Sequence, residues 1–309
     1  MRPHKCYTRI VNEDAQGEMP LISIVITNYN YGQYLQQAIT SALNQTYQPT
    51  EIILIDDAST DDSAQVFHQF EHQIKIIEHE TNKGIVYSRN EALLIARGEF
   101  LCFLDADDFW DGDYLKQMFD VATEFGADVV YPDWRLLGDI DEIRRFTEFD
   151  PTLLQLQKIH CHPESLIKLS AVRKFAFESE AVAEDWDYFI RLSLNGVHFK
   201  HASNCLINYR IKCNSRSTAG AEIETLRLFV DILKKFQAEY SDRVIDPIEL
   251  VLTKIDEKNQ QIAKVTDRNK QLQDDILAIK NSKSFRLGSA LTKPLRIVRD
   301  RLRHQPGAP

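Results

Sequence analysis

The stretch that decides the fold is FLCFLDADDFW, Phe100 to Trp110. Its first five residues are apolar or aromatic, and such a run predicts a strand that is buried on both faces. Three carboxylates follow at the end of this strand, on Asp105, Asp107 and Asp108. Because like charges repel, either water solvates these groups in an acidic turn or a divalent cation neutralises them. The motif by itself leaves both interpretations open.

Length and composition indicate one large α/β domain with a smaller extension. The chain has 309 residues, of which 43% are hydrophobic, enough for a sizeable core. Residues 1–19 are polar and no run of about 18 apolar residues occurs, so we expect neither a secretion signal nor a membrane span. The five cysteines are irregularly spaced without a CxxC pair, which argues against a disulfide framework or a zinc site. We therefore expect a cytoplasmic protein.

Charge is distributed unevenly along the chain. The net charge is −9, but residues 280–303 contain eight basic residues and one acidic residue, a net charge of +7, which leaves −16 elsewhere. A protein that binds nucleic acid directly usually presents a basic face, and this acidic body does not. We therefore expect no nucleic-acid partner for the body, whereas the basic tail requires a separate interpretation.

Strands and helices alternate along most of the chain, according to the spacing of the apolar residues and the turn signals between them. We expect strands at 21–27, 51–55, 74–77, 100–104, 129–131, 165–169 and 205–211, and helices at 35–43, 64–70, 85–96, 114–125 and 184–195. The segment 136–157 is polar and poorly periodic. This alternation predicts a Rossmann-like, mixed and mostly parallel sheet with flanking helices, followed by a helical extension.

Polar residues follow several of the predicted strands. Thr27 and Asn28 follow the first, Asp56 and Asp57 the second, and the aspartates of the DxDD motif the fourth. In parallel sheets, ligands bind beyond the carboxyl ends of the strands. We therefore expect these side chains to converge on one crevice.

Two further groups of residues have a functional and a structural interpretation. Glu184, Asp185 and Asp187 stand at the start of a predicted helix, where acids are favourable with the macrodipole even without a function. His160 and His162 form an HxH pair that suggests a metal site. That pair lacks a third nearby ligand, and its other interpretation is that it lines a cleft for an acceptor.

A seven-residue repeat covers the C-terminal part of the chain. Its a and d positions run through more than four heptads: Ile248, Val251, Ile255, Lys258, Ile262, Val265, Asn269, Leu272, Ile276 and Ile279. An asparagine at an a position favours a parallel two-stranded coiled coil, so we expect a homodimer through residues 248–280. The alternative is a helix packed on its own domain.

The basic tail that follows, residues 281–303, has one apolar face. Leu291, Leu295, Val298 and Leu302 share this face and arginines surround it. A basic amphipathic segment of this kind predicts contact with anionic lipid headgroups, at the inner face of the cell membrane. The alternatives are a solvated basic helix and a frayed tail.

Four ordered blocks together resemble the family 2 glycosyltransferases. They are PLISIVITNYNYGQYLQQAITSALNQTY, EIILIDDASTDDS, NKGIVYSRNEALLIARGEFLCFLDADDFW and AEDWDYFIRL. The resemblance implies a GT-A fold, a UDP-, dTDP- or GDP-sugar donor, a divalent metal (Mn²⁺ or Mg²⁺) and inversion at the anomeric carbon. Together with the repeat and the basic tail, it leads us to expect an N-terminal arm (1–19), a GT-A domain (20–220), a helical region (221–280) with the coiled coil at 248–280, and the basic tail (281–309). The membrane helices and the QxxRW-like motif of the processive members are absent from this sequence, so we expect one sugar to be transferred per binding event.

The resemblance also assigns roles to residues of the donor site. Asp107 would bind the metal, and Asp105 would hold the metal or the ribose. Ala106, which stands between them, would also contact the nucleotide-sugar. Asp57 would accept a hydrogen bond from the base. The other donor-binding positions that the resemblance implies are Thr27 and Tyr29 in the base pocket, and Arg89 at the nucleotide or its phosphates.

The reaction itself would need a general base, because inversion in one displacement requires a deprotonated acceptor hydroxyl. The resemblance places this base at Asp185, with Glu184 and Trp186 shaping the donor-sugar or acceptor site. Arg210 belongs to a segment that resembles the family's loop over the donor. Lys212 stands there in place of the usual histidine, which puts the match of that loop in doubt.

Two other functions compete with this assignment. Haloacid-dehalogenase-like phosphatases also place a DxD motif after an apolar strand, but usually near the N-terminus. A catalytically degenerate nucleotide-sugar domain could act as a coiled-coil assembly platform, which the intact Asp107 and Asp185 argue against. We therefore expect a glycosyltransferase acting on a glycan or lipid-linked acceptor in the synthesis of a bacterial surface polysaccharide.

Overall fold

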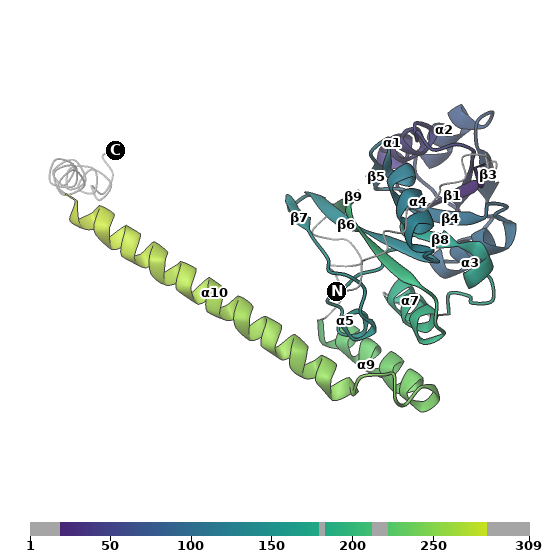
Figure 1. Ribbon diagram of the computed structural model, residues 1–309. Helices are drawn as coiled ribbons and strands as arrows, with labels where there is room; N and C mark the ends of the chain where they lie inside the picture. The colour runs from purple at the N-terminus through teal and green to yellow at the C-terminus, as the bar shows by residue number, and fades with distance from the viewer. Residues whose placement is uncertain (1–18, 179–182, 212–221, 283–309) are drawn as a thin grey trace, which may run out of the picture. The chain divides into compact units, whose positions relative to one another are not determined.

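The computed structural model describes residues 19–178, 183–211 and 222–282. Its contacts divide the chain into two compact units, Met1–Leu250 and Val251–Pro309. The first contains the sheet and the site, and the second contains most of the long helix α10 (Pro247–Asn281) (Figure 1).

The described part of the first unit contains nine strands in a single sheet. They are β1 (Ile22–Asn28), β2 (Thr50–Asp56), β3 (Lys75–Glu78), β4 (Phe100–Asp105), β5 (Phe109–Trp110), β6 (Val129–Gly138), β7 (Glu142–Arg144), β8 (Leu166–Lys168) and β9 (Phe199–Ile211). The helices of this unit are α1 (Gly32–Leu43), α2 (Ser63–Phe67), η1 (His68–Phe70), α3 (Ile85–Ile95), α4 (Tyr114–Phe125), α5 (Pro151–Gln155), α6 (Leu169–Val172), α7 (Glu184–Leu194) and α9 (Glu222–Glu239).

The sheet has the order β3-β2-β1-β4-β8-β6-β9-β5, with β7 paired to β6. The strands β3, β2, β1 and β4 are parallel neighbours, whereas β8 runs antiparallel to both β4 and β6. The predicted fold class, a mixed and mostly parallel sheet with flanking helices, is confirmed.

Strand residues alternate between two hydrophobic clusters, one on each face of the sheet. Ile24 of β1 and Cys102 of β4 belong to the cluster that includes residues of α1, α2 and α4. Their neighbours Val25 and Phe103 belong to the cluster that includes residues of α3, α6, α7 and α9. Helices therefore cover both faces of the sheet, which is why the FLCFL stretch is apolar without alternation.

The first compact unit extends to Leu250 and so includes residues beyond the predicted glycosyltransferase domain (20–220). Ile232, Leu233 and Phe236 of α9 are buried in the same cluster as residues of β4 and α7. The helix α9 is therefore part of the globular unit. Among the described residues, no helix is long and apolar enough to cross a membrane.

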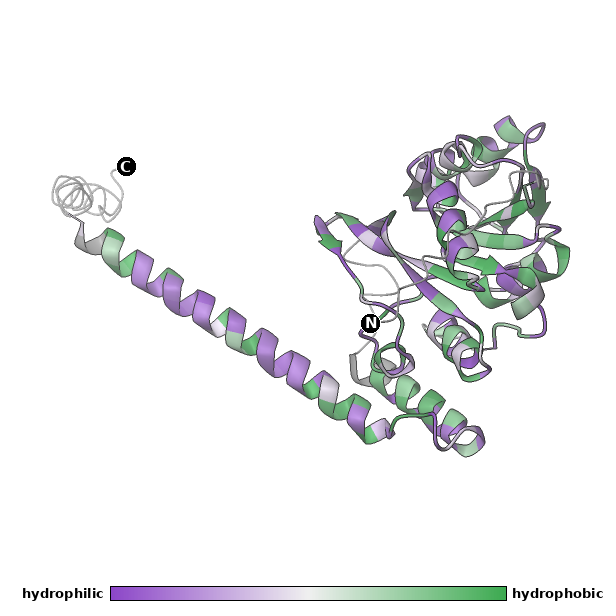
Figure 2. Ribbon diagram, viewed as in Figure 1, coloured by the Kyte–Doolittle hydropathy of each residue, from purple (hydrophilic) through white to green (hydrophobic). Residues whose placement is uncertain are grey.

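The helix α10 presents most of its predicted core positions to solvent. Figure 2 shows it as largely hydrophilic with apolar residues recurring along its length. Ile262, Val265 and Ile276 are 62%, 60% and 51% exposed in the single chain. The basic tail lies outside the described residues.

Candidate functional site

The carboxyl ends of β1, β2 and β4 bring predicted site residues side by side. In the parallel register, Thr27 pairs with Asp105 and Asn28 pairs with Asp56. Oγ1 of Thr27 donates a hydrogen bond to Oδ1 of Asp105 at 3.4 Å. The structure thus has the convergence at one edge that the parallel topology predicts.

Arg89 on α3 connects this edge of the sheet to α7. Its side chain is 4% exposed, and its two terminal nitrogens lie 3.4 Å from Oδ1 of Asp105 and 3.2 Å from Oε1 of Glu184. Burial disfavours its charge, but the two carboxylates outweigh this and raise the pKa of Arg89 above its usual value. In this structure Arg89 therefore serves as the shared cation of two acidic site residues.

Asp185 is the first-turn neighbour of Glu184 on α7. Its Oδ1 accepts a hydrogen bond from the backbone N–H of Trp186 at 2.7 Å. Although Asp185 keeps some solvent exposure, the loss of surrounding water and then the charge of Glu184 raise its pKa to about 7, against the opposing effect of Arg89. A carboxylate with such a pKa is suited to accept a proton near neutral pH.

The DxDD segment turns sharply after β4, where the N–H of Asp108 donates to the carbonyl of Asp105 at 3.0 Å. The Asp105 side chain is 25% exposed and Asp107 is half-buried, whereas Ala106 is buried between them. The two outer members of the DxD motif therefore keep access to solvent, as metal-binding carboxylates need.

Arg210 on β9 fixes this turn. Its Nε donates to the carbonyl of Asp107 at 2.8 Å, its backbone N–H donates to Oδ1 of Asp108 at 2.6 Å, and its guanidinium lies 4.4 Å from the ring centroid of Tyr34. The structure thus brings Arg210 to the DxD segment. Lys212, which departs from the family pattern, lies outside the described residues.

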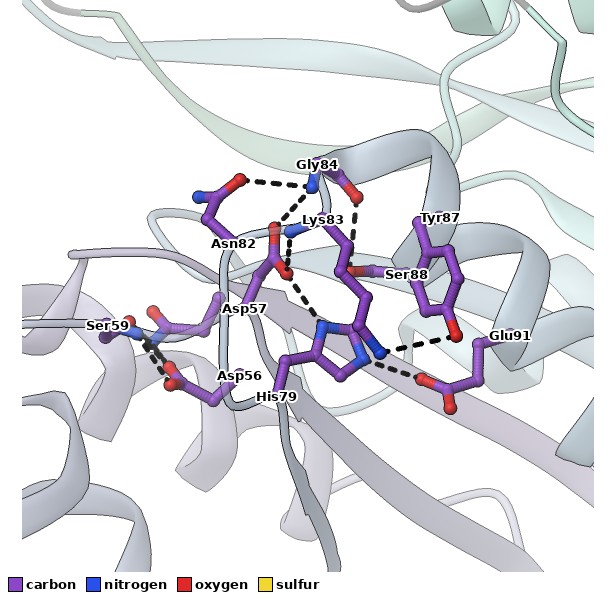
Figure 3. A network of polar contacts seen from close by, with 11 residues as sticks. Asp56, Asp57, Ser59, His79, Asn82, Lys83, Gly84, Tyr87, Ser88 and Glu91 are labelled. Atoms are coloured by element: carbon purple, nitrogen blue, oxygen red, sulfur yellow. Dashed lines mark hydrogen bonds and ion pairs between the residues drawn. The ribbon is translucent and has the colours of Figure 1, made fainter.

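Asp57, directly after β2, is held by a dense set of donors. Figure 3 shows its carboxylate between His79 and the backbone amides of Lys83 and Gly84. The residue is 5% exposed. Asp57 is therefore fixed in one orientation at the edge where the resemblance places the nucleotide base.

The side chains of two further predicted residues, Trp186 and Tyr29, have different surroundings. The indole of Trp186 is buried and donates to the carbonyl of Leu154 on α5 at 2.8 Å. The side chain therefore packs between α7 and α5. Tyr29 is 45% exposed after the end of β1.

Sequence reasoning left the role of His162 open, and the structure places its ring beside the DxD motif. Its Nε2 lies 3.8 Å from Oδ2 of Asp105, with a side chain that is 9% exposed. Burial lowers the pKa of His162 to about 4, so the ring is neutral at pH 7. The HxH pattern identified the two histidines but not their surroundings. The ring of His160 packs against Trp134, with 5.3 Å between the ring centroids.

Glu164 is a second residue that the sequence did not reveal. It is 0% exposed, and its Oε2 accepts from Nε1 of Trp110 at 2.6 Å. Burial raises its pKa, with a further contribution from the charge of Asp105. The pKa of Asp108 is raised by burial and by the charge of Glu164. These two acids support the turn from inside, and no sequence signal distinguished them from solvent-exposed acids.

The residues of the DxD motif fit a divalent cation that is shared with a substrate. No group of three or more His, Cys, Asp or Glu side chains that could hold a metal occurs within residues 19–178, 183–211 and 222–282. Mg²⁺ is usually bound by one or two carboxylates together with substrate phosphates, and Mn²⁺ accepts the same oxygen ligands. Asp105 and Asp107 supply two carboxylates of this kind.

Known proteins resemble this chain in sequence and in fold. Its segment 23–163 matches the model of "Glycosyl transferase family 2". One curated relative is WfaP of Escherichia coli, named a UDP-Glc:alpha-D-GlcNAc-diphosphoundecaprenol beta-1,3-glucosyltransferase. This chain is 42% identical to WfaP over 93 residues, which cover 30% of this chain and 37% of WfaP. The first curated relatives that it matches are covered over 44%, 38% and 48% of their length, which is less than half.

Two solved structures share the fold at low sequence identity. S. aureus TarS in complex with UDP-GlcNAc has a TM-score of 0.59 at 20% identity, covering 69% of this chain and 66% of TarS. The mannosyltransferase PcManGT from Pyrobaculum calidifontis, in complex with GDP-Man and Mn²⁺, has a TM-score of 0.56 at 16% identity, covering 88% of this chain and 83% of PcManGT. The chain therefore matches glycosyl transferase family 2 over residues 23–163 and shares its fold with these two structures.

Proposed function

We propose that this chain is an inverting glycosyltransferase. It transfers one sugar from a nucleotide-diphosphate sugar to a hydroxyl of a glycan or lipid-linked acceptor. The observation that carries the proposal is the cluster at the carboxyl end of the sheet, where Arg89 joins Asp105 to Glu184 next to Asp185. This cluster combines a partly exposed carboxylate, Asp105, which could help to hold a cation, with Asp185, whose raised pKa suits a general base.

Each member of the cluster has a distinct task in the proposed reaction. A divalent cation held by Asp105 and Asp107 would neutralise the charge that develops on the leaving diphosphate. Asp185 accepts the proton of the attacking acceptor hydroxyl. Arg89 balances the charge of Asp105 and Glu184, so the acids remain together without a large electrostatic cost.

A relative supports the choice of acceptor. The name of WfaP describes transfer from UDP-Glc to a sugar on diphosphoundecaprenol, a lipid carrier. We propose by analogy a lipid-linked or glycan acceptor in the synthesis of a bacterial surface polysaccharide. The match to glycosyl transferase family 2 argues against the phosphatase alternative.

Loss of the metal-binding carboxylate is expected to abolish donor turnover. We expect Asp107→Ala to remove the Mn²⁺- or Mg²⁺-dependent release of nucleoside diphosphate across a panel of UDP-, dTDP- and GDP-sugars. Asp120→Ala, which alters an aspartate whose side chain is 58% exposed, serves as the control and should keep full turnover. If the wild-type protein binds no donor with either metal, the transferase proposal is wrong and the assembly platform becomes the better account.

We further propose that α10 pairs with α10 of a second copy of this chain. Its exposed a and d positions would be buried in such a dimer, and Asn269 would fix the register. The contact of the basic tail with anionic lipid stays a prediction, since residues 283–309 lie outside the described part. Failure to sediment with anionic vesicles would contradict it.

The dimer should depend on the core positions of the repeat. A charge at position a introduces an unpaired buried carboxylate, so we expect Ile262→Asp to convert the protein to a monomer at micromolar concentration. Sedimentation equilibrium measures the change. Gln260→Asp adds the same charge on the outer face of the helix and should leave the dimer intact. A monomeric wild-type protein at this concentration would overturn the pairing.

A further inference from the structure

The hydrogen bonds of Asp57 limit what its carboxylate can still accept. Oδ1 of Asp57 accepts from Nδ1 of His79 at 2.7 Å and from the N–H of Lys83 at 2.8 Å. Among the described residues, Oδ2 receives one hydrogen bond, from the N–H of Gly84 at 2.8 Å (Figure 3). A carboxylate oxygen has about two acceptor positions. Oδ1 is therefore fully used, and Oδ2 has one position left.

The donors that fill Oδ1 are built into the fold. His79 has a side chain that is 3% exposed, and its other ring nitrogen lies 2.9 Å from Oε2 of Glu91 on α3. The ring also packs edge-on against Tyr87, with 5.4 Å between centroids. His79 is thus held between two carboxylates, and turning it away from Asp57 would leave buried polar groups unpaired.

The two backbone donors are equally fixed. Lys83 and Gly84 directly precede α3, where the positive end of the helix dipole favours a carboxylate. Gly84 has a φ of 84°, a conformation that favours glycine, and its N–H donates to Oδ2 of Asp57 at 2.8 Å and to Oδ1 of Asn82 at 3.1 Å. The last acceptor position on Oδ2 is therefore the one left for a ligand, because fixed donors occupy both positions on Oδ1.

The inference rests on the proposed function, in which Asp57 receives the base of the donor nucleotide. We propose that this base is one whose pairing edge carries a single N–H donor, uracil or thymine, and that His79 is the positioning residue that sets this preference. Uracil and thymine present one N–H between two carbonyl oxygens. Guanine presents two adjacent donors that need both oxygens of a carboxylate, and cytosine presents an acceptor nitrogen that would face Oδ2 without a hydrogen.

Equilibrium binding to the full chain tests the base preference without any mutation. Titration calorimetry in Mn²⁺ should give UDP and dTDP dissociation constants at least about tenfold below those of GDP and CDP, the difference expected for one hydrogen bond to a charged group. Equal or tighter binding of GDP would overturn the inference while leaving the transferase proposal intact. Absence of binding for all four nucleotides would instead remove the proposed function.

A variant separates the positioning role of His79 from mere packing. His79→Ala frees a position on Oδ1, so the ratio of GDP to UDP affinity should rise toward one. His72→Ala, in which the histidine side chain is 93% exposed, is the matched control and should keep the wild-type ratio. If His79→Ala weakens the binding of all four nucleotides equally and keeps the ratios of their affinities, the positioning role is wrong.

Discussion

Asp185→Asn is expected to reduce donor turnover by about 10²–10⁴-fold, the usual contribution of a general base. The amide has nearly the shape of the carboxylate but does not accept the proton of an attacking hydroxyl or water. Donor binding should change only slightly, because in the proposed function other residues hold the cation and the base of the nucleotide. Release of nucleoside diphosphate from UDP-sugars, measured together with calorimetric binding, separates the two effects.

The pH dependence of turnover provides an independent check on this assignment. Loss of water and the charge of Glu184 raise the pKa of Asp185 to about 7. Below this pH the group is protonated and inactive as a base, so wild-type turnover should rise with pH through about 7. Asp185→Asn should lack this rise.

Asp187→Asn is the matched control, because acids in the first turn of α7 could simply stabilise the start of that helix. Asp187 is in the same first turn, but its Oδ2 pairs with Nη2 of Arg191 at 2.7 Å. This variant should lose thermal stability and keep its turnover. Turnover by Asp185→Asn within a few-fold of wild type would mean that another group is the base.

The central part of the sheet could be predicted because its residues follow simple patterns. The strands β1, β2 and β4 are rich in apolar residues and end in polar ones, and the intervening helices have apolar residues at helical spacing. Parallel topology then requires the strand ends to share one edge. This is why Thr27 and Asp105 were placed together correctly from sequence alone.

The periphery of the sheet was predicted less well. The prediction ended a strand at Tyr131, directly before Pro132, whereas β6 continues to Gly138. A register shift between Pro132 and Asp133 accommodates the proline, which has no N–H to donate to the ladder. The short strand β7 is exposed at every position, so it leaves no hydrophobic pattern in the sequence.

The supporting residues of the site come from a segment without periodicity. The carbonyl of Pro163 accepts from the N–H of Phe103 at 3.3 Å, which brings the turn at His162–Ser165 against β4. This contact joins residues far apart in sequence, and local patterns carry no information about it. His162 and Glu164 therefore emerged as neighbours of the DxD motif only from the structure.

Arg89→Leu is expected to lower the free energy of unfolding by about 3–5 kcal/mol, because it leaves two acidic neighbours without their buried cation. The side chain is 4% exposed and lies within 3.4 Å of Asp105 and 3.2 Å of Glu184. Urea unfolding measures the loss. Arg97→Leu is the matched control, since the Arg97 side chain is 78% exposed in its ion pair with Glu51. Because water surrounds the Arg97 guanidinium, and Glu51 keeps its hydrogen bonds from Ser23 and the backbone N–H of Arg97, this substitution should cost less than about 1 kcal/mol.

Arg89→Leu should also change the pH dependence of turnover. Arg89 opposes the rise in the pKa of Asp185, so its removal should raise that pKa further and shift the pH dependence of turnover to higher pH. Adding Glu184→Gln to Arg89→Leu removes one of the uncompensated charges and should recover part of the lost stability. Equal losses in Arg89→Leu and Arg97→Leu, or an unchanged pH dependence, would show that Arg89 is not the shared cation of the acidic cluster.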